Sequence, residues 1–365
     1  MTITIVIKRP RVAEGMGRSL KAILINLALS ALLISLIGVD VVVGTYRITP
    51  LQVYEALIDG VYPIFSLPRD ITLVVLHLRL PETLAAAILG ASLASAGAML
   101  QLVLRNYLAS TYTLGVSAAA GFGAALAIVL GFGGYVIKYY LPVVTAPYLV
   151  IVSSFIFSSI AASLVYALAY VRGASPNVII LAGVAIMFLF SMGTSMLQYF
   201  ANNPDATYAI AMWMLGNLTN VRLGYIPYMA LSIIPIIYYV LVSKRVDAMS
   251  LGDEVAHSLG VDVGRLRLTL TLLTAFQAAA VVSFVGVVGF VDLVTPNIAR
   301  LIVGNDSAKL AITSALMGAD LTLVSDIISR SLVPPYIIPI GIILSLIGAP
   351  YLLLMVILRG GGYGS

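Results

Sequence analysis

Residues 243–267, SKRVDAMSLGDEVAHSLGVDVGRLR, form a charged island in a chain that is otherwise strongly apolar. Long hydrophobic runs flank this segment on both sides. Charged residues make up only 10% of the sequence, whereas 61% of the residues are hydrophobic. A soluble domain is about half apolar and about a quarter charged. The composition therefore predicts an all-α, polytopic membrane protein, with the island as an extramembrane segment.

Apolar windows bounded by charged residues, proline or glycine divide the chain into candidate membrane spans. A helix needs about 20 apolar residues to cross a bilayer, so 365 residues leave room for about ten spans. Only Gly286 and Gly289 separate the seventh span from the eighth; if they do not, the count is nine and the C-terminus changes side. The predicted spans are 21–43, 81–103, 114–134, 146–170, 178–200, 226–242, 268–285, 288–303, 309–328 and 337–358.

Lysine and arginine are unevenly distributed over the predicted loops. With ten spans, 14 of the 20 basic residues fall on the side of the two termini and 6 on the opposite side. Loops rich in lysine and arginine stay in the cytoplasm. The sequence therefore predicts a multi-pass plasma-membrane protein with a cytoplasmic tail over 1–20, a single transmembrane domain over 21–358 and a cytoplasmic tail over 359–365. The loop 244–267 is then cytoplasmic.

Several classes of site are excluded or disfavoured by composition and motif. The chain has no cysteine, so disulfides and thiolate metal sites cannot form, and its two histidines, His77 and His257, lie far apart. No G-x-x-x-x-G-K-S/T loop that could cradle phosphates occurs. No nucleophile and base are arranged for catalysis. We therefore expect no metal site, no cofactor and no enzymatic activity on this chain, and no nucleic-acid partner.

Segments in order along the chain, from Arg79 to Arg359, carry a recognisable pattern. They are 79–121, which begins RLPETL, LAGVAI (181–186), WMLGNL (213–218), LGDEVAHSLGVDVGRLR (251–267), VGFVDLVTPNIARLIVGND (288–306), SDIISR (325–330) and IPIGIILSLIGAPYLLLMVILR (338–359). Together they resemble the iron-siderophore, haem and cobalamin permease family, the FecCD-like membrane subunits of type II ABC importers. The sequence departs from that pattern at His257, Asn297 and Ile337, where the family usually has arginine, histidine and glutamate.

The resemblance implies a permease with ten spans per subunit that works as a homodimer, with the translocation path at the subunit interface. It implies two cytoplasmic ATPase subunits below the dimer and an extracellular solute-binding protein above it. ATP and Mg²⁺ then bind to the ATPase partner, and membrane lipid surrounds the spans. The implied cargo is of the metal-chelate type: ferric siderophore, haem or cobalamin.

Two groups of residues take roles from the resemblance. The island is similar to the family's coupling loop, which rests on the ATPase. Arg79 and Arg330 match arginines with which the family binds the solute-binding protein, and Glu82 stands where a third such arginine is usual. The residues that we expect at the ATPase contact are Leu251, Gly252, Asp253, Glu254, Ala256, His257, Leu259 and Gly260.

Two intramembrane acids, Asp292 and Asp320, stand where the family has small residues. A charged side chain in the bilayer costs at least about 2.5–3.5 kcal/mol, so such residues usually face a cavity or a partner. We expect at least one of them to line the translocation path, with Asn297 nearby; a structural hydrogen bond is the other possibility. The alternative function is an ion-coupled secondary transporter in which Asp292 and Asp320 bind the coupling ion at broken helices.

Overall fold

The computed structural model describes residues 11–359 except 45, 61, 63, 66, 134–145 and 202–203. At 11–19, 132–133, 146–147, 356 and 358–359 it describes the backbone but not the side chains. The described residues lie mostly in helices, and no β-strand occurs among them. Seven of the described helices are long and apolar enough to cross a membrane, and two shorter apolar helices accompany them. The prediction of an all-α polytopic membrane protein is confirmed.

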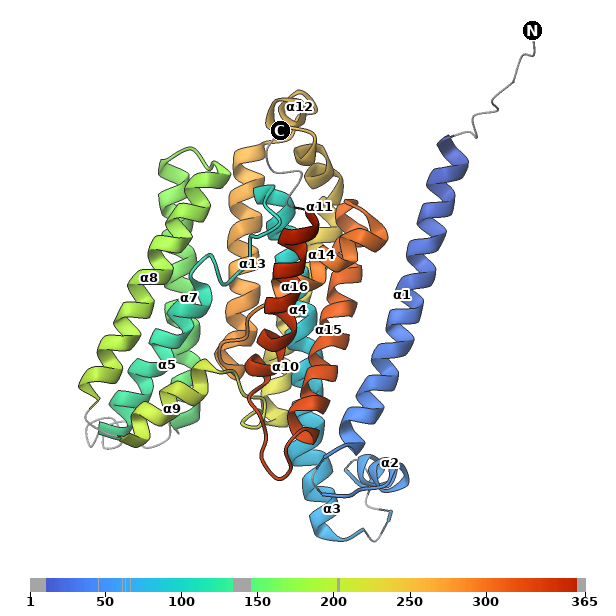
Figure 1. Ribbon diagram of the computed structural model, residues 1–365, viewed down its shortest axis with the longest axis vertical. Coiled ribbons are helices and arrows are strands. Elements are labelled where there is room, and N and C mark those ends of the chain that lie inside the picture. The colour runs from blue at the N-terminus through green and yellow to red at the C-terminus, as the bar shows by residue number, and fades with distance from the viewer. Residues whose placement is uncertain are drawn as a thin grey trace.

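Each of the predicted spans coincides with a helix of the bundle in Figure 1. Glycine separates the seventh and eighth as expected, because Gly286 has a φ of +93° and ends the preceding helix. The helices are α1 (Arg11–Val42), α4 (Leu80–Leu104), α5 (Val116–Gly133), α7 (Ala146–Val171), α8 (Pro176–Phe200), α11 (Ile234–Ser250), α13 (Val263–Val285), α14 (Val291–Val303), α15 (Ser307–Ser331) and α16 (Ile340–Arg359).

The eighth predicted span is shorter than expected. Helix α14 has 13 residues, which at 1.5 Å per residue is about 20 Å and less than the roughly 30 Å of a bilayer core. Its first part was predicted as helix from residue 288, but residues 286–290 form a loop in which Phe290 has a φ of +70°. Hydropathy does not distinguish such a loop from helix when its residues are apolar.

Short helices also lie in segments that the sequence analysis left as connections. The capping box of Thr49 and Gln52, with Pro50 at the first helical position, starts one of them. Helices of about ten residues or fewer are too short to give a clear signal in a hydropathy window. Helix α9 likewise lies outside every predicted span. These elements are α2 (Pro50–Asp59), α3 (Arg69–Leu73) with the π-helical turn η1 (Val74–Arg79), α9 (Pro204–Met214) and the 3₁₀ turn η2 (Leu223–Tyr225). The sixth predicted span, 226–242, instead begins with α10 (Ile226–Ala230) and the 3₁₀ turn η3 (Leu231–Ile233), and α11 continues it to Ser250.

Helix α4 lies at the centre of the bundle and packs closely against its neighbours. A Cβ atom added to Gly90 would lie 2.1 Å from the carbonyl oxygen of Gly318 on α15, and one added to Gly97 would lie 1.9 Å from that of Asp292 on α14. Small residues let helix backbones approach in this way, which drives packing in lipid. Gly90 and Gly97 therefore permit the close contacts of α4 with α15 and α14.

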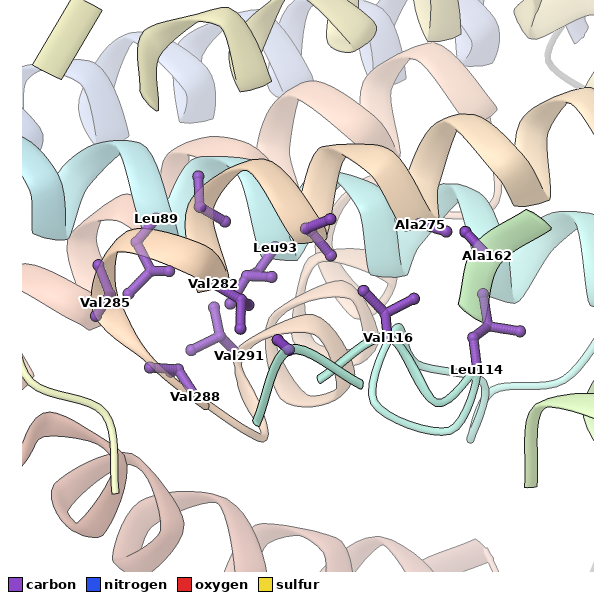
Figure 2. Packing of buried hydrophobic residues seen from close by; sticks show 14 of the residues in the cluster. Leu89, Leu93, Leu114, Val116, Ala162, Ala275, Val282, Val285, Val288 and Val291 are labelled. Carbon is purple, nitrogen blue, oxygen red and sulfur yellow. The ribbon is translucent and has the colours of Figure 1, made fainter. Parts of the chain in front are cut away.

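The largest apolar cluster joins α4 to α13 and to the loop before α14. Leu89 and Leu93 of α4 lie beside Val282 and Val285 of α13, and Val291 of α14 packs beneath them (Figure 2). These side chains are buried. The cluster fixes the point where α13 ends and α14 begins, and so positions the residues of α14 that come next.

The two ends of the bundle carry different elements (Figure 1). The short helix α12 (Asp253–Ser258) lies at one end, together with the start of α1 and the end of α16. Helices α2 and α3 lie at the opposite end. We call these the α12 end and the α2 end.

Candidate functional site

The charged island folds into the end of α11, the single short helix α12 and the start of α13. Gly252 and Gly260, with φ of +128° and +78°, bound α12 because their backbone conformations are rare for residues with a side chain. Within the island, α12 alone stands apart from the long helices, because α11 continues to Ser250 and α13 begins at Val263.

Helix α12 presents apolar side chains outward. Leu251, Val255 and Leu259 are 69%, 42% and 64% exposed. Val255 and the C-cap residue Leu259 are four residues apart and so lie on one face of α12, and Leu251 precedes the helix. Ala256 is fully buried and packs α12 against the bundle. Among the other residues predicted at the ATPase contact, Glu254, His257 and Gly260 are exposed, and Gly252 is half-buried.

Asp253 points into the bundle and holds α12 in place. Its two carboxylate oxygens accept hydrogen bonds from Nη2 of Arg267, at 2.9 and 3.1 Å, and Arg105 pairs with the same carboxylate. The hydrogen bond from Arg267, together with the charges of Arg267 and Arg105, holds the pKa of Asp253 below its usual value of 3.8. Asp253 is therefore charged at neutral pH and its main contacts are within the chain.

The two arginines that hold Asp253 connect several helices. Arg267 is 3% exposed, and it donates from Nε to the carbonyl oxygen of Val103 and from Nη1 to that of Ala174, both at 3.2 Å. Arg105 ends α4 with a left-handed φ of 50° and also donates to the carbonyl oxygen of Met249. The α12 helix is thereby fixed to the ends of α4 and α11 and to the turn between α7 and α8.

A cavity of about 630 Å³ lies between the first half of α16 and the segment that joins α4 to α5. That segment, residues 105–115, is called the 105–115 loop below. Residues from four distant parts of the chain meet around the cavity. They are Leu108, Ser110, Tyr112, Thr113, Met214, Leu215, Val287, Gly289, Phe290, Asp292, Leu293, Gly341, Ile342, Ser345 and Leu346.

Helix α14 fastens the 105–115 loop. The carboxylate of Asp292 accepts hydrogen bonds from the backbone N–H and the hydroxyl of Thr111, both at 2.7 Å. Asn297 donates to the carbonyl oxygen of Tyr107 at 3.1 Å, and the Arg300 guanidinium lies 4.5 Å from the centre of the Tyr107 ring. Asp292 thus lines the cavity while its carboxylate is held by the loop.

Asp320 lies apart from Asp292. It is buried on α15, lines neither that cavity nor the second one between α5, α7 and α9, and both carboxylate oxygens lack a hydrogen-bond partner. The structure therefore does not place the two acids around one of these cavities, as a shared ion site there would need. Asn297 was expected near the translocation path. Its buried side-chain amide holds the 105–115 loop, which lines the cavity, by donating to the carbonyl oxygen of Tyr107.

The residues predicted to dock a solute-binding protein lie in a buried charge cluster at the α2 end. Arg330 binds Asp40 of α1 and, at 2.6 Å, Asp326 of its own helix, and lies 3.8 Å from Glu82. Arg79 donates to the carbonyl oxygens of Val41 and Val42 at 3.0 and 2.6 Å, and to that of Tyr46. Both arginines are 4% exposed, so in this structure they face inward, and their docking contact stays a prediction.

Asp40 is the member of this cluster that the sequence analysis missed. It accepts a hydrogen bond from Thr83 of α4 and pairs with Arg330. Its position at the end of an apolar span, in SLIGVDVVVG, is a signal that could have identified it. Its partners, 43 and 290 residues further along the chain, could not be read from the sequence.

Comparison with known proteins gives a single answer. The sequence profile of the FecCD transport family matches residues 25–358. A protein of Methanocaldococcus jannaschii assigned as an ABC transporter permease is 39% identical over 86% of this chain and 88% of its own length. The Fe(3+)-citrate import system permease protein YfmE of Bacillus subtilis is 34% identical, over 92% and 94%. A solved structure assigned to a metal-chelate type ABC transporter in an inward-facing conformation has a TM-score of 0.78 and 27% identity, covering 91% of this chain and 98% of that one.

A multi-pass helical bundle, with a cavity between its helices and a short exposed helix anchored at one end, has the architecture of a membrane transport subunit. The chain belongs to the FecCD transport family. The resemblance read from the sequence motifs is confirmed.

Proposed function

We propose that this chain is the transmembrane permease subunit of an ATP-binding-cassette importer that moves a metal chelate inward. The observation that carries the proposal is α12, a short helix with exposed apolar side chains in it and beside it, which Asp253 fastens to the arginines at the ends of the membrane helices. Membership of the FecCD transport family supports the same conclusion.

The energy source is a separate ATPase subunit that docks on α12. Leu251, Val255 and Leu259 supply an apolar contact face, and exposed Glu254 and His257 supply polar contacts beside it. The sequence has no G-x-x-x-x-G-K-S/T loop, so ATP and Mg²⁺ bind to the partner. In the assembly, the α12 end and both termini face the cytoplasm, in agreement with the excess of basic residues predicted on that side.

Movement of α12 reaches the cavity through Arg105. This residue pairs with Asp253 of α12 and begins the 105–115 loop, which lines the cavity and is held on α14 by Thr111 and Asp292. A displacement of α12 pulls on one end of the loop while α14 holds its middle. The loop is thus the element through which the ATPase changes the shape of the cavity.

The cargo is a metal chelate that a solute-binding protein delivers from the α2 end, in the cell membrane. The named activity of the Bacillus subtilis relative, Fe(3+)-citrate import, and the metal-chelate class of the solved structure support this cargo class; ferric siderophores, haem and cobalamin fall within it. The cavity is bounded on one side by α16, and a second copy of the chain completes the translocation path as a homodimer.

Ion-coupled transport through Asp292 and Asp320 has no support from the geometry. The Asp292 carboxylate is held by two hydrogen bonds from Thr111, and Asp320 lies outside both cavities described above. Two separated carboxylates do not make one coupling site.

The test is co-purification with the ATPase subunit encoded beside this gene. We expect the wild type to form a stable complex. Leu259→Asp should reduce the bound ATPase by at least about tenfold, because it puts a charge in place of an apolar side chain that the complex buries. Leu51→Asp on α2 is the matched control, since Leu51 is equally exposed at the opposite end. A wild type that binds no ATPase, or a Leu259→Asp variant that binds it fully, contradicts the proposal.

A further inference from the structure

The segment that joins α15 to α16 presents an apolar surface at the α2 end. Its residues 332–337, LVPPYI, carry no charge and are all exposed. We call this segment the 332–337 loop; it projects beyond the ends of both helices in Figure 1. Leu332 and Tyr336 are the most exposed of its large side chains, at 60% and 74%. Large exposed apolar groups gathered in one segment mark contact surfaces.

The 332–337 loop has a fixed backbone. The N–H of Ile338 donates to the carbonyl oxygen of Ser329 at 3.1 Å, and the Ser329 hydroxyl donates back to the carbonyl oxygen of Ile338. Within the loop, the N–H of Tyr336 donates to the carbonyl oxygen of Val333 at 2.9 Å, and two prolines each fix a φ angle. A partner that binds here orders little of the chain, which favours affinity.

The loop also stands next to the large cavity. Helix α16 begins directly after it, and Gly341, Ile342 and Ser345 of that helix line the 630 Å³ cavity. The N–H of Gly341 donates to the carbonyl oxygen of Leu215, another lining residue, at 3.1 Å. A protein that releases a solute into this cavity from the α2 end therefore lies against the loop.

The neighbouring arginines are committed to contacts inside the chain. Arg330 lies just before the loop, but its guanidinium binds Asp40 and Asp326, and Arg79 is held by three backbone carbonyl oxygens. If Arg330 turned outward, it would leave the buried carboxylates of Asp40 and Asp326 without their cation, which is strongly unfavourable. Docking by salt bridges from these two arginines would break their contacts inside the chain. Docking on the 332–337 loop leaves those contacts intact.

We propose that the solute-binding protein docks on this chain through apolar contact with the 332–337 loop, with Tyr336 as the main anchor, and not through salt bridges from Arg79 and Arg330. The inference rests on the proposed function, because it assigns the docking surface for that partner. The partner then carries an apolar or aromatic patch opposite the loop. Exposed tyrosines at the centre of an interface commonly carry much of its binding energy.

The experiment measures the affinity of the solute-binding protein encoded beside this gene for the full-length permease in lipid nanodiscs. We expect Tyr336→Ala to weaken binding by at least about tenfold. Tyr54→Ala is the matched control, because Tyr54 is a tyrosine of α2 at the same end and is 61% exposed; we expect its affinity to stay within about twofold of the wild type. Raising NaCl from about 50 to about 500 mM should change the wild-type affinity by less than about threefold, since apolar contacts are not screened.

Each other outcome overturns the inference in a distinguishable way. Wild-type binding that Tyr336→Ala leaves intact, or that high salt weakens more than tenfold, assigns docking to charged groups and leaves the proposed function standing. A wild type that does not bind the protein contradicts the proposed function as well. A Tyr336→Ala variant with normal docking but an altered dimer assigns the loop to the contact between two copies of the chain.

Discussion

The carboxylate of Asp253 shows how one residue serves both the fold and the proposed function. It was predicted to touch the ATPase, but its oxygens bind Arg267 and Arg105. Replacing it would leave the Arg267 guanidinium, which is almost fully buried, without a counter-ion. Asp253 therefore acts by positioning α12, and the neighbouring exposed residues are free for a partner.

The anchoring of α12 by Asp253 has a defined pH dependence. Because the folded-state pKa of Asp253 lies below 3.8, the stabilisation is present above the unfolded-state pKa and is lost only as the pH falls through the folded-state value. Hydrogen–deuterium exchange, corrected for its intrinsic pH dependence, should show constant protection of residues 253–258 between about pH 5 and 8, with loss only below 3.8.

The variant Asp253→Asn should lack this protection over the whole range, while an Asp262→Asn control should keep it, because the amide oxygen of asparagine still caps the N–H of Arg265 at the start of α13. Protection of wild-type α12 that already fell between about pH 8 and 5 would show that another group controls the anchor.

Residue-level predictions from the sequence succeeded where a role depends on local sequence. The charge of the island set it apart from the apolar spans, and the structure places there the exposed helix α12 between Gly252 and Gly260. The inward direction of Arg79 and Arg330 was not predictable, because it depends on Asp40 and on backbone carbonyls at the end of α1 and just after it. The isolation of Asp320 likewise depends on which face of α15 each neighbouring helix covers.

At the scale of elements, the contact between α4 and α15 depends on the absence of side chains. Gly90 and Gly318 bring the two backbones together: a Cβ added to either would lie 2.1 to 2.3 Å from the carbonyl oxygen of the other. Thr322 adds a hydrogen bond from its hydroxyl to the carbonyl oxygen of Ala86 at 2.7 Å. This pair of helices carries most of the charge cluster at the α2 end, because Glu82 lies on α4 and Asp326 and Arg330 lie on α15.

We expect Gly90→Ala to lower the free energy of unfolding in detergent by about 1–3 kcal/mol, because the new methyl group forces the helices apart. Gly38→Ala is the control: Gly38 lies in α1, where an added Cβ meets nothing within 4 Å, and the change should be neutral or slightly stabilising. Thermal unfolding of the two variants in the same detergent measures the difference. Equal stability of Gly90→Ala and the wild type would contradict the close helix contact.

The sequence predicted which segments form membrane helices but not all of their lengths. Composition and the positions of charges were sufficient for α1, α4, α7, α8, α13 and α15, because each is a long apolar run with clear ends. They were insufficient for α14, whose leading apolar loop looks like helix, and for α2 and α9, which are too short for the hydrophobic signal.

On the scale of the whole molecule, two surfaces and one cavity define the proposed transport cycle. Helix α12 offers a contact to an ATPase, the 332–337 loop offers one to a solute-binding protein, and the cavity lies between them. The 105–115 loop connects the first of these surfaces to the cavity through Arg105 and Asp253. Membership of the FecCD transport family agrees with this arrangement.

The most direct test of this account is solute uptake by proteoliposomes that contain the permease, its ATPase and the solute-binding protein. Radiolabelled ferric citrate, haem and cobalamin are supplied in turn, with ATP on the ATPase side, and ionophores that abolish proton and sodium gradients are added in parallel. We predict that at least one of these metal chelates enters only with ATP and that ionophores do not reduce its uptake. Uptake driven by an ion gradient in the absence of ATP would contradict the account.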